Sequence, residues 1–391
     1  MTKKYFLLFF SIFLLNSFFA QIKLSETAEI GIITAGPGKA LYEKFGHSAI
    51  RIKDPAIGLD VIYNYGIFDF NQPNFYTNFA QGKMYYLLAK YDFKYFLNSY
   101  RHDKRWVKQQ VLNVSQKEKQ AFFNYLEKNT LKENATYLYD PFFNNCATKL
   151  RDITKIAFQN KIDFNPKTIP EKQSLRFLMN KELHWNSWGN FGINLIAGTI
   201  LDKERKITEY MYLPDYVHAL FKEGKILGNT KNQNLVKRED VLLDYKENTE
   251  SFSIFSPVVI FSALFIFVLW TTFRNKQTNQ RNKYLDFILL FTNGLLGFFL
   301  LYLWLFSSHI TAPNNFNILW AFAPNLFIAF LTLQKTPKKW LPFYFKGLVV
   351  LLVCVGLLWI LNIQVFALTN IPILLLIFVR YLYLSKHYYP L

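Results

Sequence analysis

Five apolar stretches occupy the last third of the chain. Most of them approach the ~20 residues that a helix needs to cross a hydrocarbon core of ~30 Å. Several are slightly short, so a re-entrant segment is the alternative for one of them. We therefore predict an all-α transmembrane domain with about five helices over residues 256–391. The stretches lie at about Pro257–Phe273, Leu285–Phe306, Ile318–Leu333, Phe343–Leu361 and Phe366–Leu384.

The preceding region changes from the alternating pattern of strands to the spacing of amphipathic helices, which predicts an α+β domain over residues 21–224. Strands are predicted at about Glu29–Thr34, Ser48–Ile52, Val61–Phe68 and Val107–Val114. Helices are predicted near Asn74–Gly82, Asp92–Tyr100, Gln116–Lys128 and Cys146–Phe158. Residues Lys225–Thr249 are polar and poor in large apolar groups, which predicts a linker over 225–255.

The N-terminus has the pattern of an export signal over residues 1–20. Lys3 and Lys4 precede the apolar run Tyr5–Leu15, and Ala20 offers a cleavage site. Phe18, at the third position before that cut, suits a signal peptidase poorly, so an uncleaved anchor is the alternative. In both cases the residues after 20 are expected outside the cytoplasm.

The charges of the loops predict the same orientation. Basic residues occupy the loop after the first apolar stretch and flank the third, whereas Ser307–Asn317 and Asn362–Val365 contain no Lys or Arg. The positive-inside rule requires this alternation for five crossings that begin outside. Arg380 and Lys386 then place the C-terminus in the cytoplasm and residues 21–255 on the outer side of the cytoplasmic membrane.

Composition excludes disordered and collagen-like chains, because 51% of the 391 residues are hydrophobic and 19% are aromatic. A net charge of +18 is typical of nucleic-acid binding, but more than half of it lies beside the apolar segments. Residues 256–391 carry ten basic residues and a single acid, Asp286. Membrane topology explains this surplus, so no nucleic-acid partner is predicted.

Cys146 is the candidate nucleophile. The chain has two cysteines, and Cys354 falls within the fourth apolar stretch, so Cys146 has no disulfide partner in the exported domain. Asn144 and Asn145 are good N-cap residues, which places Cys146 in the first turn of a helix. The helix dipole favours the thiolate there. An inert buried cysteine is the alternative.

His47 is the candidate base, because it begins a short alternating strand after a glycine-rich turn and a strand is a rigid support. An amide that accepts the ring N–H is a common third member of such sites, and Asn64 on the next strand is the preferred residue. Asp69 is the alternative. The other histidines of the exported region are expected to be surface or structural residues: His102, His184 and His218.

A histidine at a strand start, followed about a hundred residues later by Asn-Cys at a helix start, resembles the circularly permuted papain-like order of the NlpC-type peptidase superfamily. More specific phrases resemble the Lnb-type lipoprotein N-acyltransferases. At Asn194 the chain departs from the Asp expected in that family, so no acidic role is carried over to it. The phrases are Thr34–Gly38, Phe45–Arg51, Tyr63–Gly66, Asn144–Thr148, Trp188–Leu195, Tyr212–Tyr216 and His309–Trp320.

The resemblance implies a permuted papain-like periplasmic domain joined to a transmembrane domain in a bacterial inner membrane. It further implies N-acylation of the N-terminal cysteine of a lipoprotein, with a phospholipid as acyl donor. Cys146 would carry the acyl group as a thioester, and His47 would act as base. No cofactor is expected, because the sequence has no zinc-binding or phosphate-binding motif.

Two other functions fit the same residues. The dyad also serves cysteine amidases and peptidases that act on cell-wall peptides, and a non-catalytic membrane receptor or assembly protein would simply bury Cys146. The loop Ser307–Asn317 is expected on the same side of the membrane as Cys146. It is either a plain connector or, through His309, a part that faces the catalytic domain and holds a headgroup or the acceptor amine.

Overall fold

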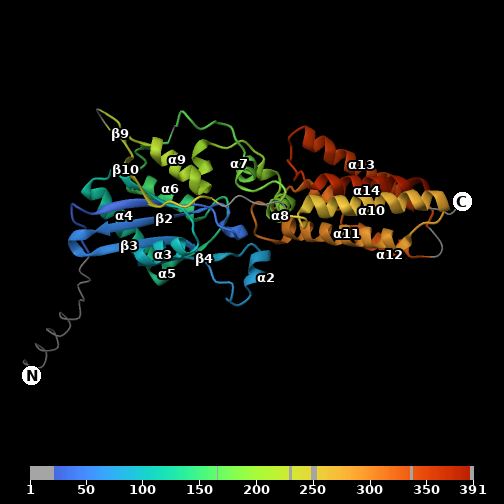
Figure 1. Cartoon of the computed structure of the whole chain (residues 1–391), viewed down its shortest axis with the longest axis horizontal. Helices are drawn as coiled ribbons and strands as arrows, with labels where there is room; N and C mark the ends of the chain where they lie inside the picture. Colours follow the sequence, from blue (N-terminus) through green and yellow to red (C-terminus); the bar gives the residue numbers. More distant parts are fainter. Residues whose placement is uncertain (1–21, 165, 229–230, 248–252, 335–337, 388–391) are drawn as a thin grey trace, which may run out of the picture.

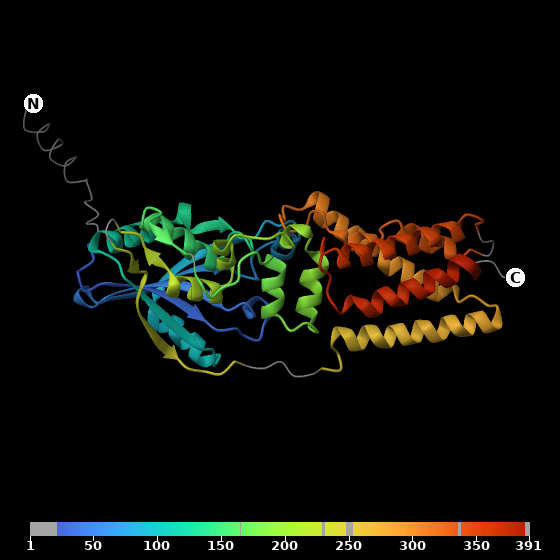
Figure 2. The same cartoon turned by 90° about the horizontal axis from the view of Figure 1, so that it is seen from above.

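A computed structural model describes residues 22–164, 166–228, 231–247, 253–334 and 338–387. A domain of mixed strands and helices is stacked end to end with a bundle of helices along the long axis of the molecule (Figures 1 and 2). This division agrees with the predicted α+β domain and the predicted helical region. The predicted export signal, residues 1–20, lies outside the described residues.

The centre of the first domain is a seven-stranded antiparallel sheet in the order β10-β5-β1-β2-β3-β4-β6. Helices cover both of its faces, so the inner strand β1 is apolar on both sides. The strands are β1 (Glu29–Ala35), β2 (His47–Asp54), β3 (Leu59–Ile67), β4 (Tyr85–Asp92), β5 (Val107–Leu112), β6 (Thr136–Leu138) and β10 (Val236–Leu243).

Three helices bury apolar side chains against one face of the sheet: α4 (Gln116–Thr130), α6 (Cys146–Ala157) and α9 (Pro214–Glu223). Helix α3 (Phe93–His102) covers the other face. Shorter elements complete the domain: α2 (Phe75–Ala80), α5 (Lys132–Ala135), α7 (Leu175–Glu182), α8 (Trp188–Ile196), and a small sheet of β7 (Ile162–Asp163), β8 (Lys225–Ile226) and β9 (Gln233–Asn234). Four 3-10 turns join them: Leu41–Glu43, Pro55–Ile57, Thr199–Leu201 and Ile207–Tyr212.

The prediction of a linker over residues 225–255 is wrong for the parts of that segment that form strands. It contains β8, β9 and β10, and β10 is an edge strand of the main sheet, paired with β5. The sequence of β10 is VKREDVLL, which is rich in charge because an edge strand exposes much of its surface. Polar composition therefore indicated an edge strand here and not a linker.

Three helices in the second part of the described chain are long and apolar enough to cross a membrane: α10 (Pro257–Thr278), α11 (Lys283–Phe306) and α13 (Leu341–Ile360). They coincide with three of the five predicted stretches. The other two stretches form α14 (Asn370–His387), which packs against α10 and α13, and a broken segment. That segment joins a 3-10 turn, Phe316–Leu319, to α12 (Asn325–Thr332), and it packs along α11.

The broken segment is stabilised by one asparagine of α11. Asn293 donates through Nδ2 to the carbonyl of Trp320 (2.8 Å), and its Oδ1 accepts from the backbone N–H of Phe322 (3.2 Å) and from Nδ2 of Asn325 (2.7 Å). Backbone groups without helical partners are tolerated at membrane depth only where protein groups satisfy them. Helix α12 alone spans only about 12 Å at 1.5 Å per residue.

An ion cluster lies buried at the opposite end of the bundle from the sheet domain. Arg380 of α14 donates to Asp286 of α11 (2.6 Å), and Arg281 donates to the other carboxylate oxygen (2.9 Å). Arg380 also donates to Thr272 and Asn275 of α10 (3.0 Å each). Asp286 and Arg380 have no exposed surface. The cluster thus joins three helices through charge-assisted hydrogen bonds.

Candidate active site

Cys146 is the first residue of α6, as predicted. Asn145 caps the helix: its Oδ1 accepts from the N–H of Thr148 (2.9 Å), and Thr148 Oγ1 accepts from the N–H of Asn145 (2.8 Å). The amide of Asn145 also donates to the carbonyls of Pro141 and Tyr212 (2.7 and 2.8 Å). Hydrogen bonds within α6 and to two other parts of the chain therefore hold the start of this helix. Cys146 itself is 8% exposed.

His47 is the first residue of β2, so the pairing of this strand in the sheet holds the backbone that carries the imidazole. Ile50 of β2 pairs with Tyr63 of β3, so the next positions, Ala49 and Asn64, lie on the same face as His47. The register therefore brings His47 and Asn64 together.

The His47–Asn64 hydrogen bond selects the tautomer of the ring. Nε2 of His47 lies 2.6 Å from Oδ1 of Asn64. Nδ2 of Asn64 donates to the hydroxyl of Tyr91 (2.9 Å), which leaves Oδ1 as the atom facing the histidine. The amide oxygen can only accept, so Nε2 carries a proton and Nδ1 is left for Cys146.

The pKa values of the pair move in opposite directions. Burial raises the pKa of the Cys146 thiol, but the adjacent His47 and the backbone N–H groups of Ser48 and Ala147 bring that pKa below its ordinary value. Burial lowers the pKa of His47, while the neighbouring sulfur and the hydrogen bond that the ring donates to Asn64 raise it, with a net increase. Both shifts favour a thiolate–imidazolium pair.

A glycine keeps space open beside the thiol. Gly66 is the extra residue at the register shift between β3 and β4, and its φ of +96° is disfavoured for other residues. A Cβ at this position would lie 3.8 Å from Cβ of Cys146 and 4.0 Å from the hydroxyl of Tyr137. The thiol and that hydroxyl therefore border the same space.

Tyr137 was not predicted as a site residue. Its hydroxyl is buried and has no hydrogen-bond partner among the described residues. Burial, with the nearby Cys146, raises the pKa of Tyr137, so the group stays protonated and can donate. The alternation of tyrosines at 137 and 139, directly before the Asn-Asn-Cys phrase, was the signal available in the sequence.

The remaining candidates lie apart from the pair. Asp69 accepts from the N–H of Asn71 (2.8 Å) and is exposed, which is an ordinary turn role. His102 is exposed beside Asp103, and His218 lies 3.3 Å from Glu239. Asn194 is buried, and its Oδ1 accepts from Arg176 (3.0 Å), so an uncharged amide satisfies that guanidinium together with Asp202.

The loop between α11 and the broken segment is bonded to α2 of the sheet domain. The N–H of Ser308 donates to the carbonyl of Gln81 (2.7 Å), and Nε2 of His309 lies 2.7 Å from the carbonyl of Phe79. Gly82 permits this approach, because a Cβ there would come within 2.6 Å of the His309 nitrogen. The loop therefore contacts the sheet domain, while its predicted role in holding a headgroup or the acceptor amine stays a prediction.

The same loop also closes the end of α8. Asn315 and Asn317 donate to the carbonyls of Asn194 and Leu195 (2.8–3.1 Å), which are the last carbonyls of that helix. Gly198, just after α8, donates its N–H to the carbonyl of Thr311 (2.8 Å). The sheet domain and the bundle thus share a joint in which side-chain and backbone N–H groups donate to backbone carbonyls.

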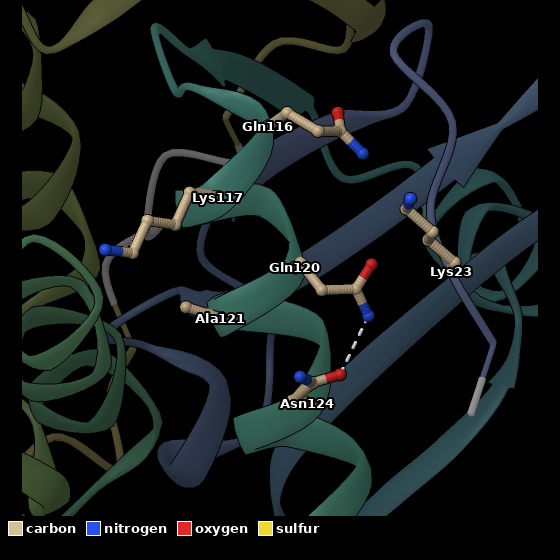
Figure 3. Close-up of a pocket in the computed structure, with 6 residues that line it drawn as sticks. All are labelled: Lys23, Gln116, Lys117, Gln120, Ala121 and Asn124. Atoms are coloured by element: carbon tan, nitrogen blue, oxygen red, sulfur yellow. Dashed lines mark hydrogen bonds between the residues drawn. The ribbon is translucent and has the colours of Figure 1, made fainter.

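A hollow on the surface of α4 is unrelated to this site. Its volume is about 410 Å³, and Figure 3 shows that its lining residues other than Lys23 lie on α4, with the hydrogen bond from Gln120 to Asn124 (2.8 Å). The lining has no cysteine, histidine or carboxylate, so it lacks the groups of a thiol–imidazole site. The residues are Lys23, Gln116, Lys117, Gln120, Ala121 and Asn124.

Two family models match the sequence over most of its length. The model described as the Lnb N-terminal periplasmic domain matches residues 16–179. The model described as the Lnb transmembrane domain matches residues 247–389. No curated protein and no solved structure matches the chain.

Proposed function

Because the chain belongs to the Lnb family and is a membrane protein with a periplasmic N-terminal domain, we propose that it N-acylates the N-terminal cysteine of lipoproteins, with a phospholipid as acyl donor. One observation carries this proposal. A buried thiol with a lowered pKa is paired with an oriented imidazole, in a domain bonded to the outer end of the membrane bundle.

The first half-reaction forms a thioester on Cys146. The thiolate attacks the carbonyl carbon of a phospholipid ester, and a C–S bond forms as the carbonyl oxygen becomes an oxyanion. The C–O bond to the glycerol then breaks, and His47 donates its Nδ1 proton to the departing oxygen. The lysophospholipid leaves, and the acyl group stays on sulfur beside a neutral imidazole.

The second half-reaction moves the acyl group to nitrogen. The α-amine of the lipoprotein attacks the thioester carbonyl, and neutral His47 accepts a proton from the amine. The C–N bond forms, the C–S bond breaks, and the thiolate–imidazolium pair is restored. Asn64 keeps Nε2 protonated through both steps, so Nδ1 performs each proton transfer.

Two kinds of donor are proposed for the oxyanion. Backbone N–H groups at the start of α6 point towards the sulfur region, as the hydrogen bond from Ala147 indicates. The Tyr137 hydroxyl borders the same space and has its proton free to donate. Donors that are fixed before the reaction stabilise the developing charge without reorganisation.

We infer that the catalytic domain is a permuted papain-like domain. Its support is a nucleophile at the start of a helix that packs on an antiparallel sheet, with the base at the start of a strand of that sheet. A cell-wall amidase with the same dyad needs no fixed joint to a bundle. The bonds between α2, α8 and the loop after α11 therefore favour substrates held in the membrane.

The test compares lipoprotein N-termini by mass spectrometry in cells that carry the wild type, Cys146→Ser or Cys354→Ser. We expect the first variant to lose one acyl chain from lipoproteins, because serine is a far weaker nucleophile without a strong base. Cys354→Ser, in α13, is the matched control and should be neutral. Unchanged lipoproteins with altered wall peptides would establish a hydrolase instead, and an active Cys146→Ser enzyme would exclude the thioester.

A further inference from the structure

Helix α2 is held at the level where a membrane span ends. Its last carbonyls and the following turn bond to Ser308 and His309, directly after α11 ends at Phe306. In Figure 1, α2 projects from the sheet domain beside the near end of the bundle. A segment fixed two residues beyond a span lies at the height of the lipid headgroups.

Four large aromatic side chains on and around α2 are exposed, and we call them the aromatic ridge: Tyr42, Phe70, Tyr76 and Phe79. Tyr76 is 74% exposed, whereas Phe75 beneath it is buried and contacts both Phe70 and Phe79 (centroid distances 5.0 and 6.3 Å). A contiguous exposed patch of this kind marks an interaction surface. Residues 68–82 contain one charged residue, Asp69.

A second set of aromatic rings continues from the ridge to the thiol. Phe75 stacks on Phe68 (6.2 Å), Phe68 on Tyr86 (4.9 Å), and Tyr86 on Tyr139 (4.3 Å). The Tyr139 ring borders the space beside Gly66. A Cβ at position 66 would lie 3.8 Å from a carbon of this ring and 3.8 Å from Cβ of Cys146. We call these four rings the aromatic row. Its ring contacts run without a break from the ridge to the site.

We propose that the aromatic ridge inserts into the outer leaflet of the membrane, and that the aromatic row receives the acyl chain of a bilayer phospholipid and leads its ester to Cys146. The occupant is a phospholipid because the ridge is continuous with the end of a membrane span. Aromatic rings are enriched at this depth, where one edge is apolar and the other is wet. The assignment of the ester to Cys146 rests on the proposed function; the insertion of the ridge does not.

Insertion is tested by photocrosslinking of the full-length protein in phosphatidylglycerol–phosphatidylethanolamine vesicles. A benzophenone amino acid in place of Tyr76 should crosslink to phospholipid. The matched control replaces Tyr95, which is also an exposed tyrosine (60%) but lies on α3, farther from the bundle (Figure 1). Equal crosslinking at both positions, or none at 76, would overturn insertion whatever reaction the protein catalyses.

The delivery of the phospholipid ester from the ridge to Cys146 is tested with the double variant Tyr76→Ser, Phe79→Ser, compared with Tyr95→Ser. We expect thioester formation from bilayer phospholipid to fall roughly tenfold or more, because two rings no longer bury apolar surface in lipid. Acylation of Cys146 by a short-chain, water-soluble nitrophenyl ester should be unchanged. Equal loss with both donors would refute the path, and a wild-type enzyme that accepts neither donor would refute the proposed function while leaving the crosslinking result intact.

Discussion

The chemistry of Cys146 depends on what surrounds its sulfur. The thiol is buried, which alone would keep it protonated, and three neighbours reverse that effect. His47 supplies the charge, while Ser48 and Ala147 supply N–H groups. Asn64 acts one step further away, by fixing the ring that acts on the thiol. A residue outside direct contact can thus decide whether the nucleophile is ready.

We expect alkylation of Cys146 by iodoacetamide to titrate below the ordinary thiol pKa of about 8.5. The rate should rise with pH as the thiol ionises, so a lowered pKa moves the inflection to lower pH. In His47→Ala the lowering charge is lost while burial remains, and the inflection should move upwards. The rate is measured by mass spectrometry in a Cys354→Ser background. An unchanged inflection in His47→Ala would mean that the two side chains are not paired.

Acyl transfer should have a bell-shaped pH profile. The acid limb reports ionisation of Cys146, and it lies at lower pH because the pKa of that thiol is lowered. The alkaline limb reports loss of the His47 proton, and it lies at higher pH because the pKa of His47 is raised. Asn64→Ala removes a hydrogen bond that raises the pKa of His47, so the alkaline limb should move to lower pH in this variant. A profile in which only the acid limb moves would contradict this role of Asn64.

Tyr137→Phe tests the oxyanion donor, since it removes only the hydroxyl. We expect the rate of thioester formation to fall roughly 100-fold, the effect typical of losing one such donor. Alkylation of Cys146 forms no oxyanion, so its rate should not change. If both rates fell together, Tyr137 would be supporting the structure of the site and not the transition state.

At the scale of elements, the sequence predicts those whose pattern arises locally. Strands β1, β2 and β3 and helix α6 all lie close to their predicted bounds, because each has a clear period and turn or cap signals. The prediction fails for the segment with β10 because its charges reflect its place at the sheet edge. The proximity of Tyr137 to Cys146 could not be predicted from the sequence either, because it depends on a bulge at Gly66.

The ion cluster shows the same limit inside the bundle. In the sequence Arg380 indicates only a cytoplasmic C-terminus, yet in the structure it is fully buried and bonded to Asp286. Sequence gives the charge of such a residue but not its partner, which lies about a hundred residues away. A charged residue within an apolar helix is better interpreted as one member of a buried ion pair.

We expect Asp286→Ala to destabilise the protein by about 3–5 kcal/mol, because it leaves Arg380 buried without its counter-ion. The measure is thermal unfolding of the full-length protein in detergent. The double variant Asp286→Leu, Arg380→Met should be more stable than Asp286→Ala, since it removes both charges together. If the destabilisation of the double variant equals the sum of the destabilisations of its two single variants, the two residues act independently.

At the scale of the whole molecule, orientation follows from which loops meet the periplasmic domain. The loop after α11 touches that domain, so it lies on the same side. In a background of Cys146→Ser and Cys354→Ser, a thiol at Ser308→Cys should react with a membrane-impermeant maleimide in intact spheroplasts. Gln280→Cys, in the loop after α10, should react only after lysis. Labelling of both in intact spheroplasts would exclude a crossing by α11.

The joint between the two halves has a consequence for how such proteins diverge and how they can be recombined. Its closest contacts are backbone to backbone, at Gly82 against residue 309 and at Gly198 against residue 313. Main-chain carbonyls accept the side-chain bonds of the joint too, and main-chain atoms are the same in every sequence, so only the side-chain donors His309, Asn315 and Asn317 depend on residue type. A chimera that takes its membrane half from a distant homologue is therefore expected to assemble where both glycines and these three donors are retained, and a single alanine at either glycine would force the two backbones apart.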